Sequence, residues 1–374
     1  DHALVRNLSK PRQCPTVPRL TSDAASFLRG RYDVVIEALD AAEPARTLLS
    51  RLLARGVAVV TANKALVAQH GSQLATTAAD RGVAFRYEAT ALAGVPFLGT
   101  LAARPFVASV DRFTAILNGT TNYVLSSLGE PGASFADALQ RAQSLGYAEP
   151  DASRDLDGAD AADKLVLLTG LFGWGRVLRE ALDVRGVSDV TADDLAAARS
   201  LGGTIKPIAF AERDASGIRA FVGPAFVPLS EPLASLGGAL NGIRIDGRHV
   251  RDLFFSGPGA GPEVTAATLL DDAIQAAVTR TIDARADQPT QPVFPSSPVT
   301  PWFIRVTVPG VLPSAAALAS LATGAGLPVE RSIDHGGAHS RWLLVGPLGR
   351  RAVNAAITRL ADTHRIAAVA FRRV

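Results

Sequence analysis

The feature that most constrains the fold is an alternation of apolar runs and amphipathic runs in the first quarter of the chain. Continuous apolar runs rich in β-branched residues begin at Tyr32 and at Gly56, and each is followed by a run with helical spacing. Buried parallel strands have this composition, and strands that alternate with helices predict a parallel sheet covered by helices. The sequence therefore predicts a doubly wound α/β sheet. Lys64 follows one of its strands, and ligands of such sheets bind at the carboxyl ends of strands.

A second constraint is the acid-rich stretch Gly146–Lys164, GYAEPDASRDLDGADAADK, which enters an apolar run with helical spacing. Asp160 and Lys164 are four residues apart, so on a helix they share a face and can touch. Asp157 is the predicted N-cap, which puts Asp160 at the third helical position. Burial destabilises a lysine's charged form unless a carboxylate compensates, and such a pair suits proton transfer or binding of a small charged substrate. On spacing alone, the alternative is a solvated loop with a surface ion pair.

Composition narrows the class of protein. The 374 residues are enough for two or three domains, and 48% hydrophobic with 20% charged residues indicates a globular protein. The net charge of +3 and the lack of a concentrated basic run give no indication of nucleic-acid binding. No apolar run is long enough for a membrane span. The single cysteine, Cys14, excludes an internal disulfide and fits a reducing compartment, so we expect a cytoplasmic protein.

The chain resembles the homoserine dehydrogenase family in two segments, and the resemblance extends over most of its length. One segment is Ile116–Leu128, ILNGTTNYVLSSL. The other is the acid-rich stretch, which carries four residues in register with the family: Glu149, Asp155, Asp160 and Lys164. The resemblance implies NAD(P)H-dependent reduction of L-aspartate 4-semialdehyde to L-homoserine, in the biosynthesis of threonine, methionine and isoleucine.

The resemblance also implies roles for these residues. The small-molecule substrate would be bound by Gly146, Glu149, Asp155 and Asp160. Glu149 would hold the substrate ammonium. Lys164 would donate the proton to the developing alkoxide, while Asp160 positions the substrate or water. Lys64, in a Thr-Ala-Asn-Lys motif, would add positive charge beside the same oxygen, because fixed charge aimed at the transition state lowers its energy.

The implied cofactor is NADP or NAD. The residues implied to bind it are Arg6, Asp40, Lys64 and Gly261. Arg6 ends a predicted strand and can meet a 2′-phosphate. Asp40 stands where the family commonly has glycine, and its charge is expected to weaken phosphate binding. The family's first strand and its G-x-G-x-x-G turn would precede Asp1, so the resemblance implies an N-terminally incomplete domain that binds cofactor poorly.

A loop at Glu88–Pro96 resembles the family loop whose oxygen atoms hold a monovalent cation, Na+ or K+. The ligands by register are Glu88, Ala91, Ala93 and Val95. A glycine-containing turn without an ion is the alternative.

The predicted domain order follows the family. A partial NAD(P)-binding Rossmann-type domain is predicted at 1–105, and the later segment 262–286 is predicted to return to it. An α+β substrate and dimerisation domain follows at 106–261. A proline-rich linker at 287–301 then leads to an ACT-like domain at 302–374. The return is predicted as a glycine-rich turn that enters a helix through Thr265. Prolines at every third position of the linker are typical of a stiff polyproline II spacer. The ACT-like domain has the pattern βαββαβ and implies an amino-acid effector, with an oligomerisation domain as the alternative. The family implies a homodimer or homotetramer.

Two rival functions remain open. One is a dehydrogenase for a different amino-acid semialdehyde, against which the intact Gly146–Lys164 motif argues. The other is a non-catalytic amino-acid sensor that retains the ACT-like domain without a working nucleotide site. Asp40 and the missing glycine turn favour this second rival.

Overall fold

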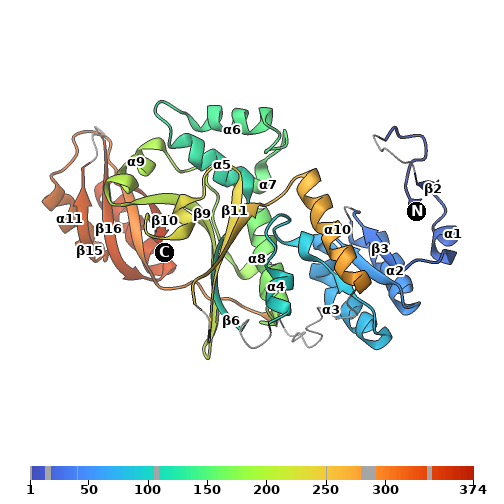
Figure 1. Ribbon diagram of the computed structural model, residues 1–374. Coiled ribbons are helices and arrows are strands. Elements are labelled where there is room, and N and C mark those ends of the chain that lie inside the picture. The colour runs from blue at the N-terminus through green and yellow to red at the C-terminus, as the bar shows by residue number, and fades with distance from the viewer. Residues whose placement is uncertain are drawn as a thin grey trace. The chain divides into compact units, whose positions relative to one another are not determined.

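The structure is a computed structural model that describes residues 2–12, 18–39, 41–104, 109–249, 251–278, 292–334 and 339–374. The chain divides into two compact units, each a mixture of helices and strands (Figure 1). The N-terminal unit comprises residues up to Ala93 and a segment that begins at Pro262. The large unit comprises Gly94–Gly261 and the C-terminal part of the chain. The mixed α/β class predicted from the sequence is confirmed.

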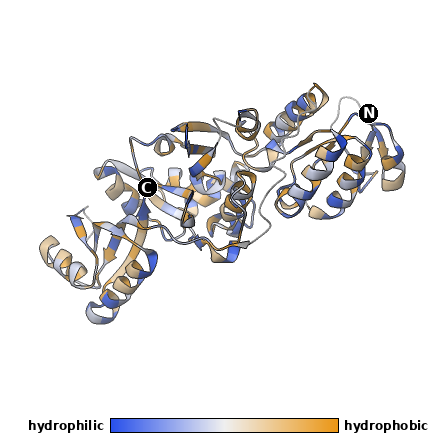
Figure 2. Ribbon diagram, turned by 90° about the horizontal axis from the view of Figure 1, so that it is seen from below, coloured by the Kyte–Doolittle hydropathy of each residue, from blue (hydrophilic) through white to orange (hydrophobic). Residues whose placement is uncertain are grey.

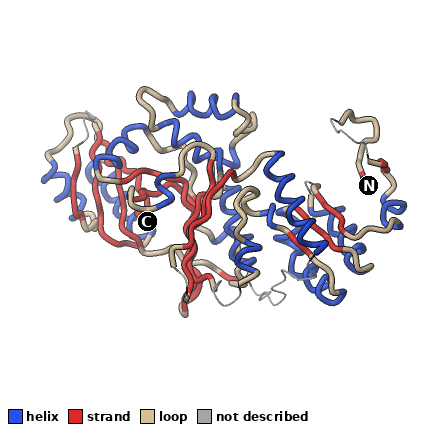
Figure 3. The backbone as a smooth tube through the Cα atoms, in the orientation of Figure 1, coloured by secondary structure: helices blue, strands red, loops and turns tan. Residues whose placement is uncertain are grey.

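The N-terminal unit contains a parallel sheet in the order β3-β4-β5. The strands are β3 (Val34–Glu37), β4 (Ala58–Thr61) and β5 (Phe85–Arg86), and the helices are α2 (Ala42–Ala54), α3 (Lys64–Arg81) and α10 (Pro262–Val278). The strands lie beside these helices in Figure 3. Leu269 and Ala276 of α10 join Ala58 and Val60 of β4 in one apolar cluster. The alternation of strand and helix is therefore as predicted, and a third parallel strand, the two-residue β5, follows α3.

The residues before Arg6 do form a strand, but it does not join β3. β1 (His2–Leu4) pairs in parallel with β2 (Arg19–Thr21) in a separate two-stranded sheet. Helix α1 (Ala24–Arg29) lies next in the chain, and the rings of His2, Phe27 and Tyr32 pack together. This aromatic contact holds β1 to α1 and to the loop before β3.

The large unit is built on one ten-stranded sheet with the order β12-β11-β6-β9-β10-β17-β14-β16-β15, and β8 pairs with β10. Its strands in this sheet before the C-terminal part are β6 (Val110–Ile116), β8 (Asp183–Val184), β9 (Gly203–Asp214), β10 (Gly217–Pro228), β11 (Leu240–Gly247) and β12 (Leu253–Pro258). Its first helices are α4 (Leu98–Ala102), α5 (Gly119–Leu128), α6 (Phe135–Ser144), α7 (Ser153–Leu156), α8 (Ala159–Leu171) and α9 (Ala192–Ser200). Short 3-10 turns lie at Arg179–Ala181 and Pro232–Ser235 in the large unit, and at Glu88–Thr90 in the N-terminal unit.

Helices of both units carry hydrophobic and hydrophilic residues together, as expected for elements that cover a sheet (Figure 2). Among the described helices, none combines the length and the apolar character that crossing a bilayer requires.

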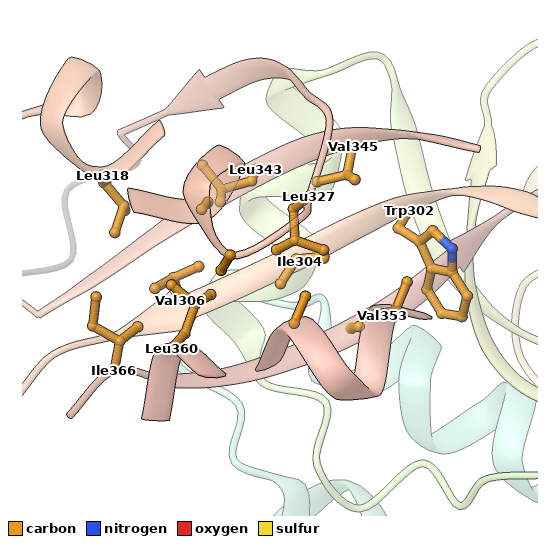
Figure 4. Close-up of a cluster of buried hydrophobic side chains, with 14 of the residues drawn as sticks. Trp302, Ile304, Val306, Leu318, Leu327, Leu343, Val345, Val353, Leu360 and Ile366 are labelled. Carbon is orange, nitrogen blue, oxygen red and sulfur yellow. The ribbon is translucent and has the colours of Figure 1, made fainter. Parts of the chain in front are cut away.

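The C-terminal part has the predicted element order βαββαβ. Its elements are β14 (Thr300–Thr307), α11 (Ala315–Gly324), β15 (Val329–Ile333), β16 (Ser340–Leu348), α12 (Arg350–His364) and β17 (Ala367–Arg373). Figure 4 shows its core, in which Trp302, Ile304 and Val306 of β14 face side chains from both helices. β17 also pairs in parallel with β10 through Ala225 and Phe226, so these strands continue the sheet of the large unit.

The described part of the predicted linker is extended, but it is not a free spacer. β13 (Pro292–Val293) pairs with β7 (Arg176–Val177). Further on, the Ser296 amide donates to Ile218 O at 2.9 Å, and its carbonyl accepts from Ala220 N at 3.0 Å. Non-proline residues between the prolines keep their backbone hydrogen-bonding groups, and here those groups pair with strands of the large unit. The linker residues before Pro292 lie outside the described residues.

Candidate active site

Lys164 lies on α8 with its side chain buried, 10% exposed. Its Nζ forms an ion pair with Asp160 Oδ2 at 3.1 Å and donates to the Leu117 carbonyl at 2.7 Å. The contact predicted from the four-residue spacing is therefore present, and the alternative of a solvated surface pair is wrong. The rest of α8 explains the burial, because its apolar residues, such as Leu165 and Leu168, are buried as well.

The start of α8 differs from the prediction by one residue. Gly158 is the N-cap, with φ +84°, and Asp160 is the second helical residue instead of the third. Asp157 still satisfies an amide of the first turn, because its Oδ1 accepts from Ala159 N at 2.9 Å. The left-handed conformation at position 158 is open to glycine at little cost, which is why the helix begins after it.

Asn118 is a central residue of the site that the sequence reasoning missed. It is the N-cap of α5, where its Oδ1 accepts from Thr121 N at 2.8 Å. Its Nδ2 donates to Asp155 Oδ1 at 2.7 Å and to Asp160 Oδ2 at 3.0 Å. One amide thus joins the two predicted carboxylates. The sequence did not indicate this role, because the partners of Asn118 lie 37 and 42 residues further along the chain.

The loop that carries Gly146 and Glu149 connects α6 to α7. Both residues are exposed, and Gly146 has φ +77°. Thr120 of α5 fixes this loop, because its Oγ1 donates to the Tyr147 carbonyl at 2.6 Å. The loop is therefore held against the same helix turn that carries Asn118. In the described part of the chain, the Glu149 carboxylate forms no hydrogen bond or ion pair with the Lys164 cluster, defined as Asn118, Asp155, Asp160 and Lys164.

The Lys164 cluster combines one buried cation with two carboxylates. A carboxylate favours the charged form of a partly buried lysine, while the Leu117 carbonyl and Asp160 fix the direction of its N–H bonds. An amide that donates to both carboxylates holds them close together in spite of their like charge. The arrangement can orient a small polar molecule and give it a proton.

The N-terminal unit presents a second polar turn, at the carboxyl ends of β3 and β4. Glu37, which the sequence reasoning also missed, is 6% exposed and accepts from Thr61 Oγ1. Asn63 caps α3 through Leu66 N at 2.9 Å and donates to Ala41 O at 2.9 Å. Lys64 is the exposed first residue of α3. A cation at the start of an 18-residue helix, at this edge of a parallel sheet, fits an anionic dinucleotide.

The other residues predicted to bind the cofactor are Arg6, Asp40 and Gly261. Arg6 is exposed after β1, and Asp40 lies outside the described residues. Gly261 has φ +132°, a conformation that requires glycine, and directly precedes α10. α10 begins at Pro262, three residues before the predicted entry at Thr265, because proline fits the first position of a helix.

The predicted cation loop is buried, with Glu88, Ala91, Ala93 and Val95 each at most 9% exposed. Two of its carbonyls already accept hydrogen bonds: that of Ala93 from Thr268 Oγ1, and that of Val95 from Phe97 N at 3.0 Å. The described residues contain no group of three or more His, Cys, Asp or Glu side chains arranged to hold a metal ion. The geometry thus accounts for this loop as a hydrogen-bonded turn.

Two family models match the chain. The model described as homoserine dehydrogenase matches residues 96–274, and the model described as the NAD-binding domain of homoserine dehydrogenase matches residues 2–88. The first range contains the Lys164 cluster. The second contains Glu37, Asn63 and Lys64, the polar residues at the carboxyl ends of β3 and β4.

Relatives and solved structures agree with the family models. A homoserine dehydrogenase from Synechocystis is 38% identical over 72% of this chain and 64% of its own length. One from Mycobacterium bovis is 35% identical over 84% of this chain and 74% of its own length. The crystal structure of a Thiobacillus denitrificans homoserine dehydrogenase superposes with a TM-score of 0.86 at 29% identity, covering 100% of this chain and 89% of the other. A hyperthermophilic archaeal homoserine dehydrogenase in complex with NADPH matches with a TM-score of 0.55 at 25% identity, covering 66% and 72%.

The parallel sheet of the N-terminal unit and its match to an NAD-binding domain define the class: an NAD(P)-dependent oxidoreductase. The large unit, with the Lys164 cluster, identifies the family within that class. The chain belongs to the homoserine dehydrogenase family, whose enzymes are oxidoreductases of amino-acid biosynthesis and act on small molecules. The resemblance noted in the sequence is confirmed.

Proposed function

We propose that the chain catalyses the reversible reduction of L-aspartate 4-semialdehyde to L-homoserine with NAD(P)H. The observation that carries this proposal is the buried Lys164–Asp160 pair, joined by Asn118 to Asp155, in a chain of this family. A cation held inside the protein beside two carboxylates suits the protonation of an oxygen on which negative charge develops.

In the proposed reaction Lys164 is the general acid. When bound, NAD(P)H supplies the hydride that forms the new C–H bond at the aldehyde carbon. Lys164 transfers a proton to the aldehyde oxygen as its π bond breaks, which gives the alcohol and a neutral amine that solvent reprotonates. Asp160 and the Leu117 carbonyl hold Nζ in place, so no reorientation is needed at the moment of transfer.

The substrate's amino-acid end is assigned to the loop between α6 and α7. The exposed Glu149 carboxylate would hold the ammonium group, with the Gly146 backbone beside it, and Asp155 would complete the subsite with Asp160. The hydrogen bond from Thr120 to Tyr147 O supports this assignment, because it anchors the loop to the turn that carries Asn118.

The cofactor is assigned to the carboxyl edge of the β3-β4-β5 sheet. Lys64, Arg6 and Gly261 would contact it, with Lys64 also opposing the negative charge that develops in the reaction, and Asp40 would lower the affinity. A further parallel strand with a glycine turn beside β3 is part of this proposal. Among the described residues β3 pairs only with β4, and its Ile36 is 43% exposed. The archaeal relative's complex with NADPH supports NADP over NAD.

The remaining family features are assigned by the same reasoning. The βαββαβ element order and the strand order β17-β14-β16-β15 support an ACT-like domain that binds an amino-acid effector. The family suggests a homodimer or homotetramer formed through the large unit. A Na+ or K+ ion at Glu88–Val95 would use the second lone pairs of the loop carbonyls. The composition and the biosynthetic family support a cytoplasmic location.

Lys164→Arg and Lys164→Ala test the proposal. Arginine keeps a cation beside Asp160 but does not release its proton in proteins, so we expect kcat to fall at least a hundredfold, as for loss of a general acid. We expect Lys164→Ala to lower kcat far more than it weakens L-homoserine binding. NADPH oxidation with aspartate 4-semialdehyde measures kcat, calorimetric titration measures binding, and circular dichroism checks the fold. Full activity in either variant would remove Lys164 from its role.

The wild-type assay also separates the rival functions. A panel of amino-acid semialdehydes distinguishes a homoserine dehydrogenase from a dehydrogenase for another substrate. A chain that binds an amino acid but neither binds NADPH nor oxidises it would instead be the non-catalytic sensor.

A further inference from the structure

Asn241, near the start of β11, is a buried amide without hydrogen-bond partners. The residue is 1% exposed, and neither its Nδ2 nor its Oδ1 has a partner among the described residues. Buried side-chain amides are normally paired, because an unpaired donor or acceptor loses its hydrogen bonds to water. Such a group in a native structure calls for an explanation from function, or from a bound water or ligand.

Two glycines enclose this amide. A Cβ at Gly259 would lie 2.2 Å from Asn241 Cγ, and a Cβ at Gly119 would lie 3.1 Å from Asn241 Oδ1. Gly119 is the first residue of α5, directly after Asn118 of the Lys164 cluster. Gly259 belongs to the glycine-rich turn after β12. The Asn241 amide is thus aimed at the N-terminal turn of a ten-residue helix, whose first N–H groups have no partners within the helix.

Asn122 provides a comparison within the same region. It is also an asparagine and 0% exposed, but its Nδ2 donates to Leu236 O at 3.1 Å and to Leu240 O at 2.9 Å. Lys206 donates to the same Leu236 carbonyl at 2.6 Å. These bonds hold the loop that leads into Asn241. Asn122 therefore has a structural role that its contacts explain, whereas Asn241 has the burial without the contacts.

We propose that Asn241 is a positioning residue of the active site, whose amide gains its hydrogen bonds when bound substrate shifts the turns at Gly119 and Gly259, which already pack against it. The unpaired amide raises the free energy of the substrate-free arrangement, and pairing it favours the bound one. The substrate would be a small polar amino-acid derivative held at the turn that carries Asn118. This inference rests on the proposed function.

Asn241→Leu tests the inference, because leucine has a similar shape and no polar atoms. Removing an amide that is unpaired in the free protein should leave the melting temperature unchanged or raise it. The same change should weaken L-homoserine binding about tenfold and lower kcat/KM at least as much. Calorimetric titration with L-homoserine, NADPH oxidation and thermal unfolding measure the three quantities. Asn241→Ala, which removes the amide without adding bulk, gives the same test if leucine does not fit.

Asn122→Leu is the matched control and should show the opposite pattern. It strands the Leu240 carbonyl and leaves Lys206 as the donor to the Leu236 carbonyl, so the melting temperature should fall while L-homoserine binding by the folded protein changes less than threefold. If Asn241→Leu and Asn241→Ala instead lower the melting temperature and leave binding and kcat/KM unchanged, Asn241 is a structural residue bridged by water and the inference is overturned. If the wild-type protein neither binds L-homoserine nor oxidises NADPH, the proposed function fails and the inference falls with it.

Discussion

At the scale of single residues, the lysines are informative because the chain has so few. Only Lys10, Lys64, Lys164 and Lys206 occur among 38 basic residues. Lys164 and Lys206 are both buried, and Lys164 forms an ion pair with Asp160, whereas Lys206 donates to the Leu236 carbonyl. Burial, together with the nearby Arg199 guanidinium, lowers the pKa of Lys206 from 10.5 to about 8.

Lys206 should make stability depend on pH in the alkaline range. Its pKa is lower in the folded state than in the unfolded state, so between pH 8 and pH 10.5 the unfolded chain binds more protons. The free energy of unfolding should therefore rise with pH across this window, by up to about 3 kcal/mol. Below pH 8 both states are charged and the cost of burial is present in full. Urea unfolding at a series of pH values measures the slope.

Two substitutions isolate this contribution. Lys206→Met should remove the alkaline rise and stabilise the protein at pH 7, while the exposed Lys10→Met should leave the rise intact. An equal rise in wild type and Lys206→Met would show that another group causes it.

The sequence predicted the residues whose partners are close in the chain. Asp160 and Lys164 lie within one helix, so their spacing alone places them in contact. The roles of Asn118 and Glu37 were not predicted, because their hydrogen-bond partners are distant in the chain and meet them only through tertiary packing. Glu37 accepts from Thr61, which is 24 residues away, across two parallel strands. The spacing also did not determine whether Lys164 is buried, because a buried helix face and a surface helix face have the same four-residue spacing.

At the scale of elements, periodicity and capping residues predicted helices well. Ser134 caps α6 by accepting from Asp137 N, and α3 ends at Gly82 in the left-handed conformation that glycine adopts readily. The errors lie at boundaries set by backbone conformation, such as Gly158, and in strands that depend on pairing. The linker is the clearest case: its prolines predict extension, but only the tertiary structure determines that Ser296 pairs with β10.

Gly158→Ala should damage both stability and catalysis. Gly158 has φ +84°, and a Cβ there would lie 3.2 Å from Val184 Cγ1 and 3.3 Å from the Arg185 carbonyl. We expect the left-handed conformation and this crowding to cost about 1–2 kcal/mol and to shift the first turn of α8, which carries Asp160. Urea unfolding and kcat measure the two effects.

Gly202→Ala is the control for this prediction. Gly202 has φ +76° with nothing within 4 Å of its Cβ position, so it carries the conformational cost alone. It should lose about 1 kcal/mol of stability with an unchanged kcat. If Gly158→Ala behaves in the same way, the start of α8 does not position the site.

At the scale of the whole molecule, the C-terminal βαββαβ part is tied to the rest of the large unit by buried ion pairs as well as by the sheet. Burial disfavours the Asp183 carboxylate, but Arg350 and Arg372 outweigh it and hold its pKa below the usual value. The Arg372 Nη2 lies 2.6 Å from Asp183 Oδ2, and its guanidinium lies 4.6 Å from the Trp302 ring centre. These contacts join β8 to β14, β17 and α12.

Asp194 forms a second junction of the same kind. It lies on α9, is fully buried and accepts from Trp342 Nε1 of β16 at 2.7 Å. It also pairs with Arg305 of β14, whose side chain is 14% exposed. Since both partners belong to the C-terminal part, an effector that shifts its strands would act directly on α9.

These junctions predict that the C-terminal part and the central strands of the large unit unfold together. Asp194→Asn keeps an oxygen for Trp342 but leaves Arg305 buried without its counter-charge, so we expect a loss of about 3–5 kcal/mol. Glu130→Gln is the control: Glu130 pairs with Arg141, both side chains are more than half exposed, and the loss of this pair should cost less than about 1 kcal/mol. Urea unfolding measures both losses.

Hydrogen exchange tests the coupling directly. The amides of α9, β14 and β16 should open with the same free energy, because a buried ion pair shared between elements couples their unfolding. Asp194→Asn should reduce this opening free energy equally in all three elements. If β14 and β16 instead open alone at lower free energy, the C-terminal part is an independently folded module, and an effector bound there would need another route to the active site.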